Sequence, residues 1–256
     1  MLTVISPAKT LDFETPTAID KFTHSSHLSQ SRKLVRRLRQ LSADDLSQLM
    51  QVSDNIAELN KQRFKQWRTP FKPENARQAL FAFKGEVYLG LDAYSMQPDK
   101  VDFAQDHLRI LSGLYGVLRP LDLIQAYRLE MGTRLDTEQG RTLYQFWDGR
   151  ITKTLNQELR QSGSNTLVNL ASKEYFKSIK PKLLKADVIT PVFKDYTKGS
   201  YQMIGFFAKK ARGMMARYLI DHRIDEPEGL KEFNREGYAF NAALSASHEW
   251  VFTRRQ

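Results

Sequence analysis

Hydrophobic and polar positions along this chain follow patterns that predict both strands and helices. Leu2 to Ile5 is a short apolar run ended by Ser6-Pro7, which predicts a buried strand. Apolar residues then recur at helical spacing over 28–41, 43–52 and 56–67. Ser42 and Asp45 make a capping pair before the second of these helices. The first quarter of the chain is therefore expected to form one strand followed by a block of helices.

The rest of the chain mixes the two kinds of pattern. Strand-like runs occur at 80–83, 125–131, 166–170, 188–193, 201–206, 238–240 and 250–253, and helical spacing covers 142–161 and 208–220. Because strands and helices are interspersed, we predict an α/β fold, a mixed sheet with surrounding helices. No linker, repeat or low-complexity tract divides the sequence, so residues 1–256 are expected to form a single domain.

The segment 101–131 holds two glycines between basic residues. Apolar positions at helical spacing over 101–111 predict a helix that Gly113 ends, and Gly116 lets the backbone approach a partner closely. Arg109 and Arg119 flank this turn, and exposed N–H groups beside guanidinium charge suit phosphate. The turn resembles the helix-hairpin-helix modules of DNA-repair proteins, although it has two residues between the glycines where those modules usually have one. A plain connector between a helix and a strand is the alternative.

Charge is the compositional feature that bears most on function. Lys and Arg number 39 against 29 Asp and Glu, a formal net charge of +10. A surplus of this size favours polyanionic partners, with nucleic acid first. There are no cysteines, which excludes disulfides, thiolate nucleophiles and cysteine-ligated metals. The sequence shows neither a membrane-spanning apolar stretch nor a signal peptide, so a cytoplasmic protein without membrane association is expected.

The sequence lacks the motifs that mark several common classes of nucleotide-binding proteins and hydrolases. The P-loop, the G-x-G-x-x-G fingerprint and the G-x-S-x-G elbow are all missing. The five histidines are scattered, so neither a metal site nor a cofactor is predicted. What remains are polar residues that follow predicted strands, namely Lys9, Lys84, Asn169 and Ser172. Loops at the carboxyl ends of strands form the ligand crevice of open α/β sheets, so these side chains are expected to converge on one cleft.

A third basic group opens the helix predicted at 208–220. Lys209, Lys210 and Arg212 follow Phe206 and Phe207 directly. Aromatic rings can stack bases where basic groups hold phosphates. This group is therefore a further candidate for contact with nucleic acid.

Seven segments together resemble one known family. They are SPAKTLDF, FKGEVYLGL, LRILSGLYGVLRPLDLIQAYRLEMG, LYQFW, VNLASKEYFKSIKP, PVFKD and FFAKKARGMMARYLI. The sequence is similar along its whole length to the YaaA family of bacterial peroxide-stress proteins. That resemblance implies a cytoplasmic protein that limits damage during hydrogen peroxide stress by keeping unincorporated iron low. It also implies an unusual α/β fold with a positively charged cleft, a helix-hairpin-helix element and binding to DNA.

Our hypothesis from the sequence is a peroxide-stress protein that binds duplex DNA, largely independently of base sequence, through a basic cleft. The expected DNA-binding residues are Lys9, Lys84, Arg109, Gly113, Gly116, Arg119, Lys209, Lys210 and Arg212. The competing hypothesis is an enzyme that acts on a nucleotide or damaged base, with Lys9 or Lys84 as a desolvated nucleophile. The sequence selects no acid or base among Asp122, Glu130 and Glu174. Direct iron binding lacks a clustered ligand pattern.

Overall fold

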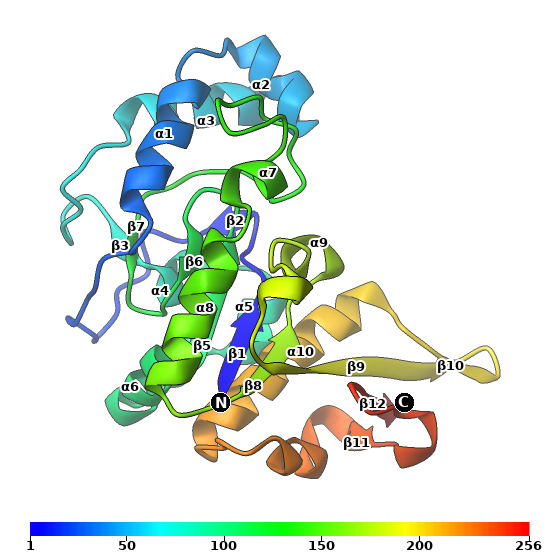
Figure 1. Ribbon diagram of the computed structural model, residues 1–256. Coiled ribbons are helices and arrows are strands. Elements are labelled where there is room, and N and C mark those ends of the chain that lie inside the picture. Colours follow the sequence, from blue (N-terminus) through cyan, green and yellow to red (C-terminus); the bar gives the residue numbers. More distant parts are fainter. Residues whose placement is uncertain (256) are drawn as a thin grey trace.

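A mixed eight-stranded sheet forms the centre of the computed structural model, which describes residues 1–255 (Figure 1). The strand order is β11-β12-β9-β8-β1-β5-β6, with β10 paired to β9. The strands are β1 (Leu2–Ile5), β5 (Leu108–Ser112), β6 (Gly116–Leu118), β8 (Thr166–Leu170), β9 (Asp187–Thr197), β10 (Ser200–Gln202), β11 (Ala239–Phe240) and β12 (Glu249–Arg254). The sheet and its helices confirm the predicted α/β class.

Strand β1 occupies the middle of this sheet. It pairs in parallel with β5 on one side and with β8 on the other, and all four of its residues are buried. A strand that is covered on both faces needs an apolar side chain at nearly every position, which the run Leu2–Ile5 supplies. The strands predicted at 2–5 and 166–170 are confirmed.

Helices cover both faces of the sheet. Helix α8 (Arg150–Gln161) lies on the face towards the viewer in Figure 1, and α5 (Glu86–Leu91), α6 (Pro98–His107) and α10 (Gly205–Asp221) lie behind it. Helices α5 and α10 cross with their backbones in contact. A Cβ atom at Gly213 would stand 1.8 Å from the Val87 carbonyl oxygen, and one at Gly90 would stand 2.1 Å from the Lys210 carbonyl oxygen. Only glycine fits at this crossing.

A group of helices stands beyond the carboxyl ends of the central strands. It comprises α1 (Leu28–Leu38), α2 (Ala43–Met50), α3 (Asp54–Gln66) and α7 (Leu143–Trp147). The predicted cap of α2 is confirmed, because the Ser42 side chain accepts from the Asp45 N–H and the Asp45 carboxylate accepts from the Ser42 N–H. A short turn, 51–53, joins α2 to α3, and the two helices pack together.

The remaining elements are short. They are β2 (Thr10–Leu11), β3 (Arg77–Gln78), α4 (Ala79–Ala82), β4 (Phe83–Lys84), β7 (Leu123–Ile124), α9 (Lys173–Phe176) and the 3-10 turns η1 (Ala93–Ser95), η2 (Pro181–Leu183), η3 (Pro227–Glu232), η4 (Arg235–Gly237) and η5 (Ala242–Leu244). Strand β2 pairs with β4, which places Thr10 opposite Lys84.

The segment around the two glycines differs from the prediction. Helix α6 ends at His107, and residues 108–112 continue as strand β5. Gly113 begins the turn that follows β5, and Gly116 is the first residue of the antiparallel strand β6, where it pairs with Ser112. The helix-hairpin-helix-like element expected here is therefore a β-hairpin. A helical pattern of apolar residues also fits a strand that is buried on both faces, so spacing alone did not separate the two.

Three other strand predictions were wrong in part. In the strand predicted at 201–206, β10 ends at Gln202 and helix α10 begins at Gly205. Residues 79–82 form a buried helical turn, α4, instead of the strand predicted at 80–83. Residues 125–131 belong to no strand ladder, yet their burial alternates as the pattern indicated, with the odd-numbered residues buried and the even-numbered ones half-buried. The alternating sequence pattern thus identified which side chains are buried, although the backbone of this segment pairs with no neighbouring strand.

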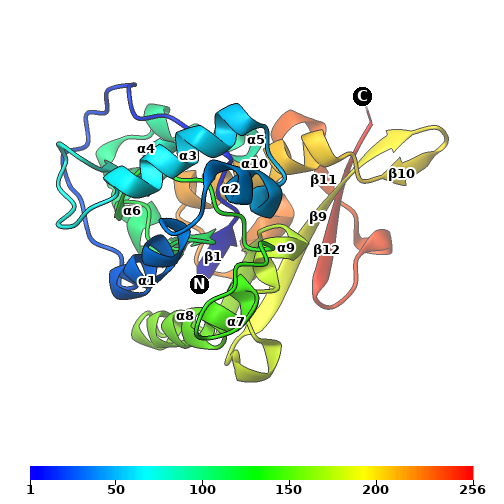
Figure 2. The ribbon, with the colours of Figure 1, turned by 90° about the horizontal axis from the view of Figure 1, so that it is seen from above.

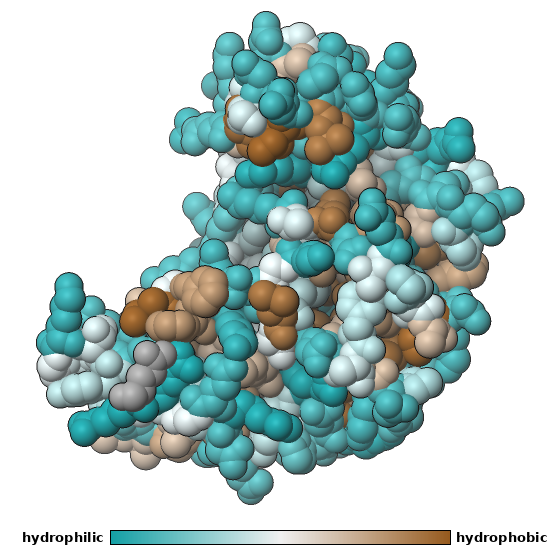
Figure 3. Space-filling model, turned by 180° about the vertical axis from the view of Figure 1, so that it is seen from behind, coloured by the Kyte–Doolittle hydropathy of each residue, from teal (hydrophilic) through white to brown (hydrophobic). Residues whose placement is uncertain are grey.

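The long strand β9 carries an arm away from the body of the molecule. Its far end pairs with β10, and the two project together beyond β12 (Figure 2). Seen from behind, the molecule is hollowed between this arm and the helices at the top (Figure 3). Among the helices of residues 1–255, none has both the length and the apolar character needed to cross a membrane.

Candidate functional site

Polar and aromatic side chains gather where the central parallel strands end. We call this group the strand-end cluster. Its members are Ser6, Lys9, Lys84, Glu86, Tyr88, Tyr127, Arg128, Glu130, Ser172 and Tyr175. The ends of β1 and β8 meet directly, because the Ser172 N–H donates to Ser6 Oγ at 2.9 Å. The Tyr88 hydroxyl donates to the Ser6 carbonyl oxygen at 3.2 Å. The predicted convergence of residues after β1 and β8 is thus present.

Lys9 and Lys84 lie at the exposed rim of this cluster. Lys9 Nζ is 3.1 Å from Glu130 Oε1, and Lys84 Nζ is 3.6 Å from Asp12 Oδ2. Their side chains are 63% and 60% exposed. A lysine nucleophile needs burial or neighbouring cations to release its proton near neutral pH. Both lysines are instead exposed and paired with a carboxylate, so the geometry does not favour the lysine-nucleophile hypothesis.

Three buried tyrosines line the inner side of the cluster. Tyr88, Tyr127 and Tyr175 are each less than one-tenth exposed. Burial raises the pKa of each phenol, and proximity to Tyr127 raises the pKa values of Tyr88 and Tyr175 further. The Tyr127 and Ser112 hydroxyls are 2.6 Å apart, which ties the end of β5 to the same place. The phenols stay neutral at ordinary pH and offer hydroxyls and ring surface.

Two charged groups of the cluster keep a buried atom without a hydrogen-bond partner. They are Glu86 Oε2, at the start of α5, and Arg128 Nε. The other end of the Arg128 guanidinium donates to Glu130 Oε1 at 3.2 Å. Most buried polar atoms in folded proteins are hydrogen-bonded, so these two atoms are exceptions.

Asn169 was predicted to face the cleft. Its side chain instead donates to Thr190 Oγ1 and accepts from the Ala171 N–H.

The expected anchor around the two glycines is inside the protein. Arg109 is 5% exposed, and its Nε donates to Glu158 Oε2 on α8 at 2.8 Å. A Cβ atom at Gly113 would stand 2.2 Å from the Leu129 carbonyl oxygen, and one at Gly116 would meet the Trp147 ring at 2.7 Å. These three residues are packed against the body of the protein and present no surface to a DNA backbone. We therefore remove them from the candidate interface.

Because Arg109 is buried and ion-paired, we expect it to stabilise the folded protein. Arg109→Met should lower the free energy of unfolding by about 1.5 to 3 kcal/mol, because it removes the charge-assisted hydrogen bond to the partly exposed Glu158 carboxylate. Urea denaturation measures this change. The double variant Arg109→Met/Glu158→Leu removes both charges and should recover most of the loss. A loss that is equal in the single and double variants would contradict this account.

The other predicted cations lie apart from one another. Arg119 Nη2 pairs with Asp122 Oδ1 at 3.0 Å and lines a recess of about 350 Å³ with His27. Burial, and then the charge of Arg150, lower the pKa of His27. On α10, Lys209 is exposed, Lys210 pairs with Glu236, and desolvation lowers the pKa of the half-buried Arg212. The sequence-predicted cations thus occupy three places.

A larger basic surface, which the sequence analysis missed, runs along α8. Its central part is a groove of about 1220 Å³, lined by four cationic side chains against one carboxylate, Asp148. A second hollow of about 350 Å³ shares Gln139 with it and reaches α1; its lining adds two carboxylates, Asp136 and Glu138. We call the two together the basic groove. Its cations are Lys33, Arg36 and Arg37 on α1, Arg150, Lys153 and Arg160 on α8, and Lys185.

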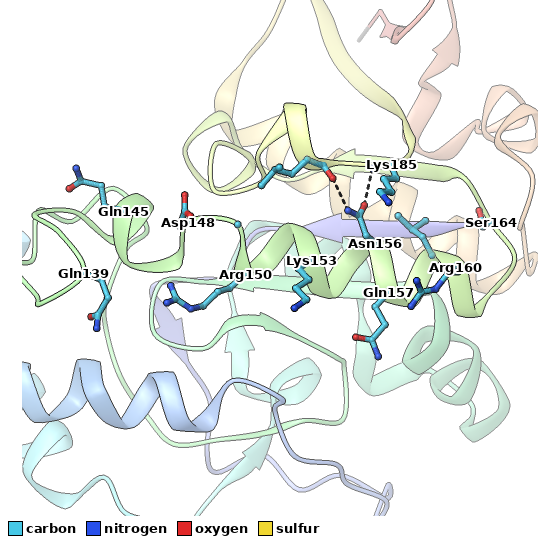
Figure 4. Close-up of a pocket in the computed structure, with 13 residues that line it drawn as sticks. Gln139, Gln145, Asp148, Arg150, Lys153, Asn156, Gln157, Arg160, Ser164 and Lys185 are labelled. Carbon is cyan, nitrogen blue, oxygen red and sulfur yellow. Dashed lines mark hydrogen bonds between the residues drawn. The ribbon is translucent and has the colours of Figure 1, made fainter.

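The polar side of α8 explains why these cations are available. Arg150, Lys153 and Arg160, with Gln157 between them, project to one side of the helix, towards α1 (Figure 4). The opposite side buries Ile151, Leu155 and Leu159. Among residues 1–255, no cation of the basic groove has a carboxylate oxygen within 4 Å. Asn156 of α8 holds the segment 183–185 at the edge of the groove, because its side chain donates to the Leu183 carbonyl oxygen and accepts from the Lys185 N–H.

Comparison with known proteins places the chain in a family. A family model described as peroxide stress protein YaaA matches residues 1–244. The chain belongs to the YaaA peroxide-stress family. UPF0246 proteins of Alteromonas mediterranea and Aliivibrio fischeri are each 56% identical to it over 256 residues, which is 100% of this chain and 99% of each relative. A UPF0246 protein of Neisseria gonorrhoeae is 54% identical over the same coverage.

Membership of the YaaA family confirms the resemblance given by the seven sequence segments. It connects the fold to the response to peroxide stress. Of the two surfaces named above, the basic groove is the one that combines several cationic side chains with a hollow in the surface of this YaaA-family chain.

Proposed function

We propose that this protein binds duplex DNA through the basic groove, largely independently of base sequence, as part of its role in peroxide stress. The observation that carries the proposal is the row of cations on α1 and α8 without carboxylate partners among residues 1–255. Cations already paired within a protein have little to gain from phosphate. Unpaired ones gain the full release of counterions from the duplex.

The dimensions of α8 agree with a contact along a DNA backbone. A helix of 12 residues is about 18 Å long at 1.5 Å per residue. That is the rise of roughly five base pairs at 3.4 Å each. Cations at successive turns of α8, with those of α1 opposite, are therefore expected to meet about four to six phosphates. Contacts of this kind position a protein on DNA without reading its sequence.

Binding of this kind places the protein on a molecule that iron-dependent peroxide chemistry damages. Limiting that damage, which the family resemblance implied, belongs to the same proposal. Within residues 1–255, no group of three or more His, Cys, Asp or Glu side chains lies together as metal ligands do. The proposal therefore includes no iron site in the protein itself. The lysine-nucleophile enzyme is not proposed, because both candidate lysines are exposed and ion-paired.

The test is the salt dependence of affinity for fully paired duplexes of different sequence. With four to six phosphate contacts, log affinity should fall with log salt concentration at a slope of roughly −4 to −5. Duplexes of unrelated sequence should give affinities within a few-fold of one another. Fluorescence anisotropy at several salt concentrations measures both quantities. A slope near zero would refute the proposal.

A further inference from the structure

A cavity outside the basic groove opens beside the end of α3. It has a volume of about 390 Å³ and lies between the last turn of α3, the loop after β2 and the segment after β7. Arg63 and Arg68 line it together with Phe13 and Trp67. None of the carboxylates of residues 1–255 lines it, and it shares no lining residue with the basic groove. A concave site of this size suits a small molecule.

The two arginines of this cavity have no partner within the described part of the chain. Neither guanidinium group has a carboxylate oxygen of residues 1–255 within 4 Å, and neither donates a hydrogen bond to those residues. Arg63 is half-buried, and desolvation lowers its pKa. A cation that is removed from water without a partner is unfavourable. An anion in the cavity would therefore gain more from Arg63 than from an arginine that is already paired.

Helix α3 does not itself occupy Arg63. An arginine in the last turn of a helix can donate to the final carbonyl oxygens. Here Arg39 takes that place, because its guanidinium donates to the carbonyl oxygens of Phe64, Lys65 and Trp67. The Arg63 guanidinium is therefore left to the cavity.

Hydrogen bonds hold the walls around the two arginines. Gln125 Oε1 accepts from the Arg68 N–H, and Gln125 Nε2 donates to the Arg68 carbonyl oxygen, both at 2.9 Å. Trp67 Nε1 donates to the Tyr115 hydroxyl at 3.0 Å. Gln125 and Trp67 thus fix the shape of the cavity. A site that is fixed before binding loses little entropy when a ligand enters.

The charges of the lining indicate the class of ligand. A phosphate monoester carries a charge of about −1.5 to −2 at neutral pH, which matches two guanidinium groups. The planar donor forks of arginine also match the geometry of phosphate oxygens. A cation would meet like charge and no carboxylate of residues 1–255. Phe13, which is 37% exposed, adds an apolar surface beside the two arginines.

We infer that this cavity binds a small phosphate monoester, with its phosphate on Arg63 and Arg68 and its apolar part on Phe13. A terminal phosphate can enter a recess, whereas a phosphate in a DNA backbone carries a single charge and is joined to sugars on both sides. The site is therefore separate from the proposed DNA interface and does not depend on it.

The test is isothermal titration calorimetry of the full-length protein with phenyl phosphate, inorganic phosphate and benzoate. Phenyl phosphate should bind several-fold more tightly than inorganic phosphate, which lacks the ring, and than benzoate, which lacks the second charge. Arg63→Gln and Arg68→Gln should each weaken phenyl phosphate by about tenfold to a hundredfold, because a hydrogen bond between charged groups is lost. Phe13→Ala should remove the advantage of phenyl phosphate over inorganic phosphate.

Two controls keep the cavity distinct from general charge. Lys65→Gln removes an exposed cation of α3 that does not line the cavity, and it should leave the affinity unchanged. Lys153→Gln, in the basic groove, should also leave it unchanged. The midpoint of urea unfolding should not fall in Arg63→Gln or Arg68→Gln, because neither guanidinium has a partner within residues 1–255 to lose.

Four results would overturn the inference. They are the absence of binding of phenyl phosphate at millimolar concentration, binding of inorganic phosphate or benzoate as tight as that of phenyl phosphate, a loss in Lys65→Gln or Lys153→Gln equal to that in Arg63→Gln, and a loss in the arginine variants that only accompanies a lower midpoint of unfolding. Duplexes that fail the salt test would remove the proposed DNA binding and leave this site standing.

Discussion

Replacing three cations of the basic groove should reduce DNA affinity on the order of a hundredfold at 0.1 M salt. The variant is Lys153→Gln/Arg160→Gln/Lys185→Gln, which leaves the buried side of α8 untouched. Each lost phosphate contact reduces the salt slope by about 0.9, so the slope should become less negative by roughly two to three. Fluorescence anisotropy with a fully paired duplex at several salt concentrations checks both numbers.

A charge-matched control separates local contact from overall charge. The variant Lys21→Gln/Arg223→Gln/Arg235→Gln removes the same number of positive charges, at exposed positions that pair with Asp102, Asp99 and Asp221. Distant charges are screened beyond about 10 Å at 0.1 M salt. This control should therefore keep the slope of the unmodified protein. Equal effects in the two triple variants would mean that the protein attracts DNA by net charge and that the basic groove is no interface.

Gly213→Ala should cost about 3 kcal/mol of stability or more, the largest effect expected from a single methyl group in this protein. The added Cβ would stand 1.8 Å from the Val87 carbonyl oxygen and 2.8 Å from the Leu91 nitrogen, both of them backbone atoms of α5. Backbone atoms of a helix cannot change rotamer as a flexible side chain does, so α10 must move away from α5 to make room for the methyl group. Urea denaturation followed by circular dichroism measures the loss.

Gly205→Ala is the matched control, because Gly205 begins the same helix and a Cβ there meets nothing within 4 Å. It should leave stability unchanged or slightly raised, since alanine favours helix more than glycine does. A Gly213→Ala variant as stable as this control would show that α5 and α10 adjust without cost. The close crossing would then not be required by the fold.

The sequence predicted the parts of the fold whose burial is uniform or strictly periodic. Leu2–Ile5 and Thr166–Leu170 are apolar enough to identify central strands, and Ser42 with Asp45 identifies the start of α2. Residues 108–112 were predicted as the end of a helix because their apolar positions continue a helical spacing. Arg109 within them was predicted to be exposed, but it pairs with Glu158, which lies 49 positions away along the chain. A contact of that kind leaves no local signal, so the buried arginine was taken for an exposed one.

The functional surfaces were predicted unevenly for a related reason. Residues that follow strands could be grouped by a rule of sheet topology, and Ser6 and Ser172 do meet. The basic stripe of α8 was missed, although its signal was present. Arg150, Lys153, Gln157 and Arg160 recur at intervals of three and four, opposite the buried Ile151, Leu155 and Leu159. That sequence pattern shows an exposed helix face, but only the folded structure shows that α1 brings further cations opposite it.

The central position of β1 also constrains how the chain can fold. Thr3 pairs with Leu108, and Leu2 pairs with Leu167, so both ladders of this strand join positions more than about a hundred residues apart. Contacts between such distant positions must overcome the entropy of closing long loops, and proteins that depend on them fold slowly. On a ribosome, β1 emerges long before either neighbour exists, and its apolar side chains stay uncovered until β8 has been made. Assembly of the sheet is therefore a late event, and an unfinished chain is the form of this protein most exposed to aggregation.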